Sequence, residues 1–152
     1  PWDLAVIGGG ATGIAIALDA ASRGLSVVML ERFDFGSGTS SRSTKLVHGG
    51  VRYLRQGNLT LVQDALRERS YLHQNAPHLV HDKTFLIPCA NLFQWVMYGV
   101  GLKLYDLLAF GNRFGRSHMI SKSRVEAIAP SLRPDPFRGG VLYHDGQFDD
   151  SR

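Results

Sequence analysis

Three glycines with the spacing Gly8-x-Gly10-x-x-Gly13 are the first residues whose pattern points to a chemistry. They follow a short apolar run at residues 4–7, which is typical of a buried strand, and they open a stretch of helix formers at residues 11–22. In such a turn, backbone N–H groups can approach a pyrophosphate closely, at the positive end of the helix dipole. The pattern therefore predicts a dinucleotide site. The alternative is a glycine turn that binds nothing.

Glu31 supports the ligand-binding interpretation because it ends the next apolar run, at residues 25–30. A carboxylate at that point can accept hydrogen bonds from a ribose diol. It would also repel a 2′-phosphate, so NADP is disfavoured. The longer spacing through Ala17 and Gly24 to Glu31 resembles the ADP-binding βαβ unit of FAD-dependent oxidoreductases, although many NAD enzymes share its core.

The second chemical signal is residues 38–54, which carry five hydroxyl side chains between residues 39 and 44, beside Arg42 and Lys45. Hydroxyls and cations suit phosphate oxygens and polyols. Gly49 and Gly50 would let the backbone approach something flat or bulky, and Arg52 can hold a phosphate or carboxylate in a bidentate manner. A solvated basic surface loop is the alternative.

The remaining pattern supplies the elements that would position these residues. Residues 32–57 are expected to be mainly loop with a short helix near residues 41–48. The apolar stretch 95–110 is interpreted as buried core, and a membrane-contact surface is the alternative. Capping-box spacings begin at Thr60 and Ser123. The further expected elements are helices at 60–75, 92–110 and from 123 to before Pro130, and strands at 83–87 and 139–144.

Composition excludes several classes of protein. The 152 residues suit about one domain, and 44% hydrophobic residues can form a core, unlike a disordered tail. Cys89 is the single cysteine, so an intramolecular disulfide is impossible. A net charge of +4 is too small to indicate nucleic-acid binding. The histidines are scattered without a metal-binding motif, so no metal site is expected. Both ends are expected to be cut from a longer chain.

Residues 7–13 with 18–24, residues 38–54 and residues 143–150 together resemble FAD-dependent glycerol-3-phosphate dehydrogenases. The resemblance implies an α/β fold with an FAD-binding Rossmann-like βαβ domain of the glutathione-reductase and D-amino-acid-oxidase type. That domain would be incomplete here and would be followed by the start of a substrate domain. The expected division is 1–57 for the βαβ unit and flavin loop and 58–152 for the segments that continue into the later domains.

The resemblance also implies an activity and roles for residues. The family oxidises sn-glycerol 3-phosphate to dihydroxyacetone phosphate through FAD and passes the electrons to a quinone, whereas a subgroup of oxidases uses oxygen instead. His48, Arg52 and Tyr53 would be catalytic, with Arg52 as a phosphate ligand and His48 as the only candidate base. The residues that would bind FAD are Gly8, Gly9, Gly10, Ala11, Thr12, Gly13, Glu31, Arg32, Thr39, Ser40, Ser41, Lys45, Leu46 and His48.

The implied partners are the substrate, a quinone, a membrane surface and, as an open option, a second copy in a homodimer. The implied location is the cytoplasmic side of an inner membrane, with peripheral attachment, on the assumption of a bacterial source. Two alternatives stay open: another flavin oxidoreductase of the amino-acid-oxidase type, and a nucleotide-binding fragment that is not catalytic by itself.

Overall fold

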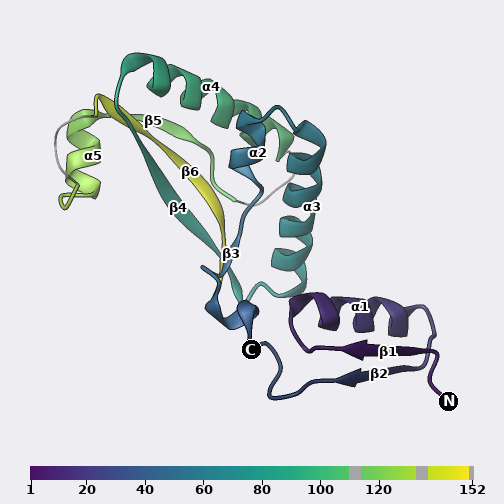
Figure 1. The fold of residues 1–152 in the computed structure, drawn as a ribbon. Helices are drawn as coiled ribbons and strands as arrows, with labels where there is room; N and C mark the ends of the chain where they lie inside the picture. Colours follow the sequence, from purple (N-terminus) through teal and green to yellow (C-terminus); the bar gives the residue numbers. More distant parts are fainter. Residues whose placement is uncertain (110–113, 133–136, 151–152) are drawn as a thin grey trace. The chain divides into compact units, whose positions relative to one another are not determined.

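Two compact units make up the chain (Figure 1). The computed structural model describes residues 1–109, 114–132 and 137–150, apart from the side chains of Arg52 and Arg55. The first unit comprises Pro1–Leu46 and Phe148–Arg152, and the second comprises Val47–Gln147. The units part after Leu46 because helix α2 (Val51–Arg55) contacts the helices that follow it. The expected domain boundary after residue 57 stays a prediction.

The first unit contains the predicted strand–helix–strand motif. Strand β1 (Leu4–Ile7) pairs in parallel with β2 (Val27–Leu30), so that Val6 lies opposite Met29. Helix α1 (Ala11–Ser22) packs against both strands. A strand buried on both faces was expected, but Ile7 is 87% exposed. The reason is that α1 covers only one face of this two-stranded sheet.

The second unit is built on a sheet with the strand order β3–β6–β4, in which β5 also pairs with β6. The expected strand at 83–87 lies inside the longer β4, and the expected strand at 139–144 is the first part of the longer β6. Strand β5 was not predicted, since its four residues show no clear alternation; it runs antiparallel to β6. The strands of this sheet are β3 (Leu46–Val47), β4 (Val80–Cys89), β5 (His118–Ser121) and β6 (Gly139–Phe148).

Three further helices, α3 (Leu59–Asn75), α4 (Leu92–Leu108) and α5 (Lys122–Ile128), confirm the helical segments expected after residue 57. Their caps differ from the predicted ones. The Asn58 side chain caps α3 and the Ser121 side chain caps α5, in place of Thr60 and Ser123. Each true cap lies two residues earlier, because apolar periodicity places the end of a helix only to within one or two residues.

The short helix expected near residues 41–48 is wrong. A 3-10 helix at Thr39–Arg42 and strand β3 occupy that stretch instead, and α2 follows the glycine pair at residues 49–50. Hydroxyl side chains that bond to nearby carbonyls favour such short turns over a regular helix. Residue 110, the expected end of the long helix, lies outside the described residues.

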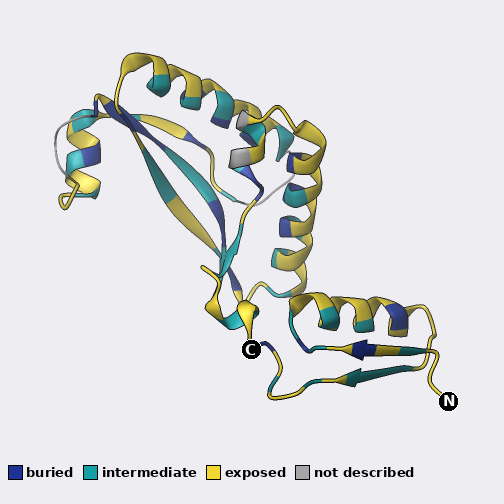
Figure 2. Ribbon diagram, in the orientation of Figure 1, coloured by how far each residue is buried: buried dark blue, intermediate teal, exposed yellow. Residues whose placement is uncertain are grey.

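The core of the second unit lies where α3 and α4 meet β4 and β6. One face of α4 points into it, whereas the opposite face carries Phe93 at 76% and Val100 at 65% exposure (Figure 2). The expectation that this stretch is buried core therefore holds for only one side of the helix. The buried members of the core are Val62, Leu66, Cys89, Leu102, Tyr105 and Val141.

Candidate functional site

The glycine-rich turn joins β1 to α1 and has the geometry that a phosphate-binding turn needs. Gly8 has φ = 104°, which side chains other than hydrogen disfavour. A Cβ atom on Gly13 would overlap the carbonyl oxygen of Gly8, so only glycine lets α1 pack this closely on the turn. Gly10 is the N-cap of α1 and has no side chain to occupy the helix terminus. The backbone there is consequently accessible to an anion.

Glu31 follows β2 and is fixed against this turn. Its Oε2 accepts a hydrogen bond from the Gly9 backbone N–H (2.6 Å), and its Oε1 accepts one from the Phe33 N–H (2.9 Å). The bonds from Phe33 and then from Gly9 lower the pKa of Glu31 below its ordinary value. The carboxylate is therefore ionised at neutral pH, and each oxygen has a lone pair left for a further donor.

The hydroxyl-rich segment reaches the same helix terminus. Ser40, in the 3-10 helix, accepts a hydrogen bond at Oγ from the Ala11 N–H (3.0 Å). Thr39 and Ser40 both line the groove described below. Ser41 differs from the expected phosphate donor, since its hydroxyl donates to the Ser37 and Gly38 carbonyls (3.0 and 2.9 Å).

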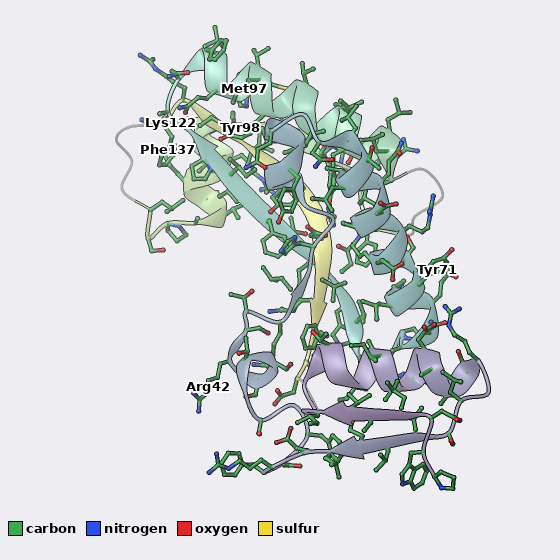
Figure 3. All side chains as sticks on the ribbon, turned by 45° about the vertical axis from the view of Figure 1, so that its right-hand side comes forward. Arg42, Tyr71, Met97, Tyr98, Lys122 and Phe137 are labelled. Atoms are coloured by element: carbon green, nitrogen blue, oxygen red, sulfur yellow. The ribbon has the colours of Figure 1, made fainter. Side chains whose placement is uncertain are left out.

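The two cations of this segment also point elsewhere than expected. Lys45 Nζ donates to the Ser41 carbonyl (2.9 Å) and lies 3.9 Å from a carboxylate oxygen of Asp150. Lys45 has φ = 57°, the one positive φ among the described residues other than glycine, and such strain is found most often near functional sites. Arg42 is exposed, and its side chain extends outward (Figure 3).

These elements enclose an open groove of about 810 Å³ in the first unit. It brings together eight of the residues expected to bind the cofactor: Gly8, Gly10, Ala11, Thr12, Gly13, Glu31, Thr39 and Ser40. Gly9 lies beneath the Phe35 ring rather than in the groove. Arg32, Ser41, Lys45, Leu46 and His48 are not among the groove residues.

The groove also contains residues that the sequence did not suggest. Phe33, Asp34 and Ser37 continue the chain beyond Glu31, so their position directly after the acidic residue was the available signal. Phe148 and Asp150 come from the far end of the chain. No sequence pattern connects them with the glycine turn; the amide of Phe148 bonds to the Lys45 carbonyl (2.9 Å).

The predicted catalytic residues lie around α2 in the second unit. His48 is exposed, and its ring makes no hydrogen bond to any described residue. Tyr53 is 38% exposed, which differs from a core aromatic residue. Arg52 lies in α2, but its side chain is outside the described residues. Their catalytic roles stay predictions.

The glycine pair before α2 approaches the protein's own core and not only a ligand. A Cβ atom on Gly49 would collide with the Tyr105 hydroxyl and with Leu66. Gly50 is the N-cap of α2 and has φ = 78°. For Gly49, the bulky neighbour inferred from the sequence is therefore an internal side chain.

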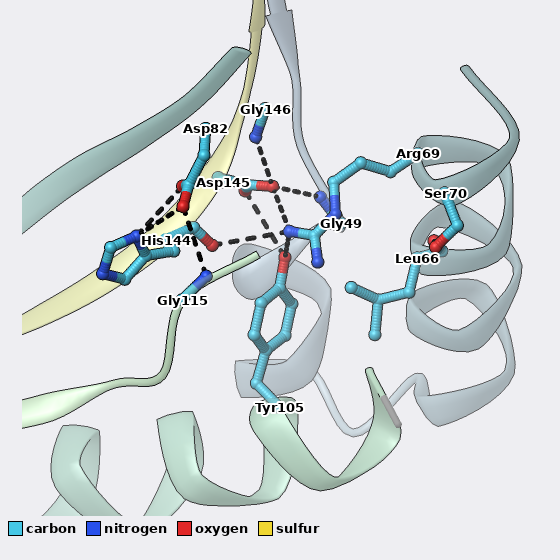
Figure 4. A network of polar contacts seen from close by, with 10 residues as sticks. All are labelled: Gly49, Leu66, Arg69, Ser70, Asp82, Tyr105, Gly115, His144, Asp145 and Gly146. Carbon is cyan, nitrogen blue, oxygen red and sulfur yellow. Dashed lines mark hydrogen bonds and ion pairs between the residues drawn. The ribbon is translucent and has the colours of Figure 1, made fainter. Parts of the chain in front are cut away.

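A buried polar network next to Gly49 was missed by sequence reasoning. Its centre is an ion pair between Arg69 and Asp145, with 2.6 Å between Nη1 and Oδ1. Arg69 lies on α3 and Asp145 on β6, 76 residues apart, so no local pattern could have paired them. Figure 4 shows both side chains with the Tyr105 hydroxyl between them.

Within residues 1–109, 114–132 and 137–150, no three histidine, cysteine or acidic side chains cluster in a way that could hold a metal ion. No helix of the described chain combines the length and the apolar character that crossing a membrane requires.

Comparison with known proteins gives the chain a family. The profile of the family described as FAD dependent oxidoreductase matches residues 3–152. The chain is 48% identical to the mitochondrial glycerol-3-phosphate dehydrogenase of Homo sapiens, over 99% of this chain and 22% of that protein. The glycerol-3-phosphate dehydrogenase from Bacillus halodurans, solved in complex with FAD, superposes with a TM-score of 0.65 and is 35% identical, over 98% of this chain and 22% of that one.

A further solved structure shows the same fold at lower identity. The L-proline dehydrogenase from P. horikoshii superposes with a TM-score of 0.71 at 16% identity, covering 99% of this chain and 38% of that one. The chain spans about a fifth of the length of the glycerol-3-phosphate dehydrogenases to which it is similar. It belongs to the FAD dependent oxidoreductase family.

Proposed function

We propose that the groove of the first unit binds the ADP part of FAD. The observation that carries this proposal is the glycine turn, in which Gly13 has no room for a side chain and Gly10 places no side chain at the α1 terminus. The pyrophosphate would lie at that terminus, beside Thr12 and the Ser40 hydroxyl, which accepts the hydrogen bond of the Ala11 N–H. Glu31 would accept hydrogen bonds from the ribose diol.

The activity that we propose for the whole protein is the oxidation of sn-glycerol 3-phosphate to dihydroxyacetone phosphate. It is supported by the identity of 35–48% to proteins named glycerol-3-phosphate dehydrogenase, against 16% for a proline dehydrogenase of the same fold. An enzyme of the amino-acid-oxidase type is the second candidate, and the fold alone would suit it equally well. The identity favours the phosphorylated substrate.

In this proposal the residues around α2 orient the substrate. Bound FAD would supply the redox chemistry by accepting a hydride from substrate C2. Arg52 would bind the substrate phosphate, and Tyr53, which is partly exposed on the same helix, would face the substrate. His48, whose ring is exposed, would take the proton of the C2 hydroxyl. Lys45, Ser41, Leu46 and Arg32 would lie toward the pyrophosphate and flavin.

Peripheral membrane attachment, a quinone acceptor and a homodimer complete the proposal for the whole protein. The outward face of α4 supports attachment, because its apolar residues are exposed beside the apolar groove that includes Met97 and Tyr98 (Figure 3). The relatives to which the chain is similar carry mitochondrial names. Whether this protein lies on an inner membrane, as we propose, is tested by its partition between membrane and supernatant after cell lysis.

The test of the activity is turnover with an artificial electron acceptor. The full-length protein, purified with its flavin, is given sn-glycerol 3-phosphate, glycerol or L-proline in separate reactions. We expect reduction of the acceptor with the first compound only, because glycerol lacks the phosphate that Arg52 would bind. Turnover of L-proline without turnover of glycerol 3-phosphate would favour the second candidate. If the 152-residue chain alone retains FAD but gives no turnover, the alternative of a nucleotide-binding fragment that is not catalytic by itself is supported.

A further inference from the structure

The Asp145 carboxylate is the centre of the buried network in the second unit. Its side chain is 3% exposed and receives four hydrogen bonds. At Oδ1 it accepts from Arg69 Nη1 (2.6 Å) and from the backbone N–H groups of Gly49 and Gly146 (both 3.1 Å). At Oδ2 it accepts from the Tyr105 hydroxyl (3.4 Å). Asp145 therefore joins β6, α3 and α4 to the turn before α2 (Figure 4).

Arg69 donates the shortest of these four hydrogen bonds and so holds the carboxylate in place. Its side chain is 2% exposed, and its guanidinium lies over the Phe114 ring, 4.4 Å from the ring centroid. Nη1 also donates to the Tyr105 hydroxyl (3.2 Å) and to the His144 carbonyl (3.4 Å). Nε has no hydrogen-bond partner among the described residues. The guanidinium is thus packed and bonded so that it fixes Asp145 together with Tyr105 and the His144 carbonyl.

A buried ion pair of this kind is a poor source of stability. Removing two charges from water costs about as much as their mutual attraction returns, and apolar replacements of the same volume are often neutral or stabilising. A buried pair does fix the positions of the groups bonded to it. Here one of those groups is the Gly49 N–H, which is buried and donates its hydrogen bond to Asp145 Oδ1.

The turn at Gly49 has little freedom once this bond is formed. The Tyr105 hydroxyl and Leu66 lie against the Gly49 Cα, and Gly50 has the left-handed conformation that begins α2. Burial raises the pKa of Tyr105 above its ordinary value, so its hydroxyl remains protonated and can donate to Asp145. His48 precedes the turn directly, and Tyr53 follows on the first turn of α2.

We propose that the Arg69–Asp145 ion pair is a positioning device that holds the Gly49–Gly50 turn, and that through this turn it orients His48 and Tyr53 for the roles that the proposed function gives them. This inference rests on the proposed function, which assigns His48 and Tyr53 to the substrate. Neither residue of the pair touches the reacting atoms. Both act by fixing the backbone between the residues that would do so.

The test compares Asp145→Asn with Asp64→Asn in the full-length holoenzyme. The second variant is a matched control, since the same chemical change removes an exposed pair with Arg67 (3.9 Å) on the same helix as Arg69. For Asp145→Asn we expect kcat with glycerol 3-phosphate to fall by about tenfold or more, with a smaller change in KM, because a small displacement of a positioned group is costly. We also expect the visible absorption band of the flavin to shift. The control should match the wild type in both readouts.

If Asp145→Asn does not fold, Arg69→Lys is the second test variant, because it keeps the positive charge and loses the planar guanidinium. The same two readouts, kcat and the flavin absorption band, are then measured on it. The double variant Arg69→Met/Asp145→Asn should lose no more activity than the worse single variant if the residues act as one unit. A kcat within about twofold of the wild type would overturn the proposal, and so would a loss of kcat with an unshifted flavin band. If the wild-type holoenzyme does not oxidise glycerol 3-phosphate, the proposed function fails, whereas the band shift still tests the pair.

Discussion

Replacing Gly13 with alanine tests the phosphate-binding turn at its tightest point. The added Cβ would overlap the Gly8 carbonyl oxygen and would approach the Gly8 carbonyl carbon to 3.1 Å and Val6 Cγ1 to 3.4 Å. The first neighbour is backbone, so no rotation of a side chain can relieve the contact. Helix α1 must therefore move away from the turn whose N–H groups would bind the pyrophosphate.

The magnitude follows from the cost of overpacking. Inserting a methyl group into a filled site costs about 1–3 kcal/mol. If this cost falls on the conformation that binds FAD, the affinity should weaken about 5- to 150-fold, since each 1.4 kcal/mol corresponds to about a factor of ten. The gain in helix propensity from glycine to alanine, about 1 kcal/mol, acts in the opposite direction.

The assay is titration of apoprotein with FAD, followed by flavin fluorescence. Gly101→Ala is the matched control, because Gly101 also lies within a helix and its added Cβ would meet only Leu54 Cδ2, at 3.9 Å. The control should bind FAD like the wild type and melt at the same or a higher temperature. An FAD affinity of Gly13→Ala within about twofold of the wild type would show that the turn accommodates the methyl group and still binds FAD.

Three further predictions concern other parts of the chain. Glu31→Gln should weaken FAD binding by about tenfold or more, as expected for loss of a charged acceptor. In the wild type the pKa of Glu31 lies below its ordinary value of 4.5, so Glu31 stays ionised and the FAD affinity should change little with pH above that value. A series of FAD titrations at different pH should show the affinity falling only at lower pH, where Glu31 becomes protonated. Gly49→Ala should lower the free energy of unfolding by about 1–3 kcal/mol in denaturant titrations, because its Cβ would collide with Tyr105 and Leu66. The 152-residue chain expressed alone should self-associate in sedimentation experiments and retain FAD weakly, because Ile7, Phe33 and Phe93 are 76–87% exposed; a monodisperse, cooperatively melting monomer would contradict this.

The first unit could be predicted from the sequence because its signals are local. The bounds of β1 and α1 follow from an apolar run, a glycine turn and Gly24 at the helix end, where φ = 85°. The contact of Glu31 with the turn was foreseeable, because the carboxyl ends of two parallel neighbours meet at one edge of their sheet. Residues 4–30 thus contain most of the information needed to predict their fold.

The second unit could be predicted less well because its determinants are distant in sequence. Nothing near Arg69 indicates that Asp145 is its partner, and Gly49 appeared to be a ligand-facing glycine because the contacting Tyr105 is 56 residues away. The outward face of α4 appeared to be core because apolar residues occupy both sides of the helix. Periodicity shows where the apolar residues of a helix lie, but it does not show which face of the helix packs against another element.

The most direct test of the proposed function is reduction of the bound flavin by substrate in the absence of oxygen and of any other acceptor. The full-length holoenzyme is mixed rapidly with sn-glycerol 3-phosphate, and the visible band of the oxidised flavin is followed in time. We predict that the band bleaches in a single turnover and that one dihydroxyacetone phosphate forms for each flavin reduced. A protein that contains FAD but keeps its oxidised spectrum with this substrate would contradict it.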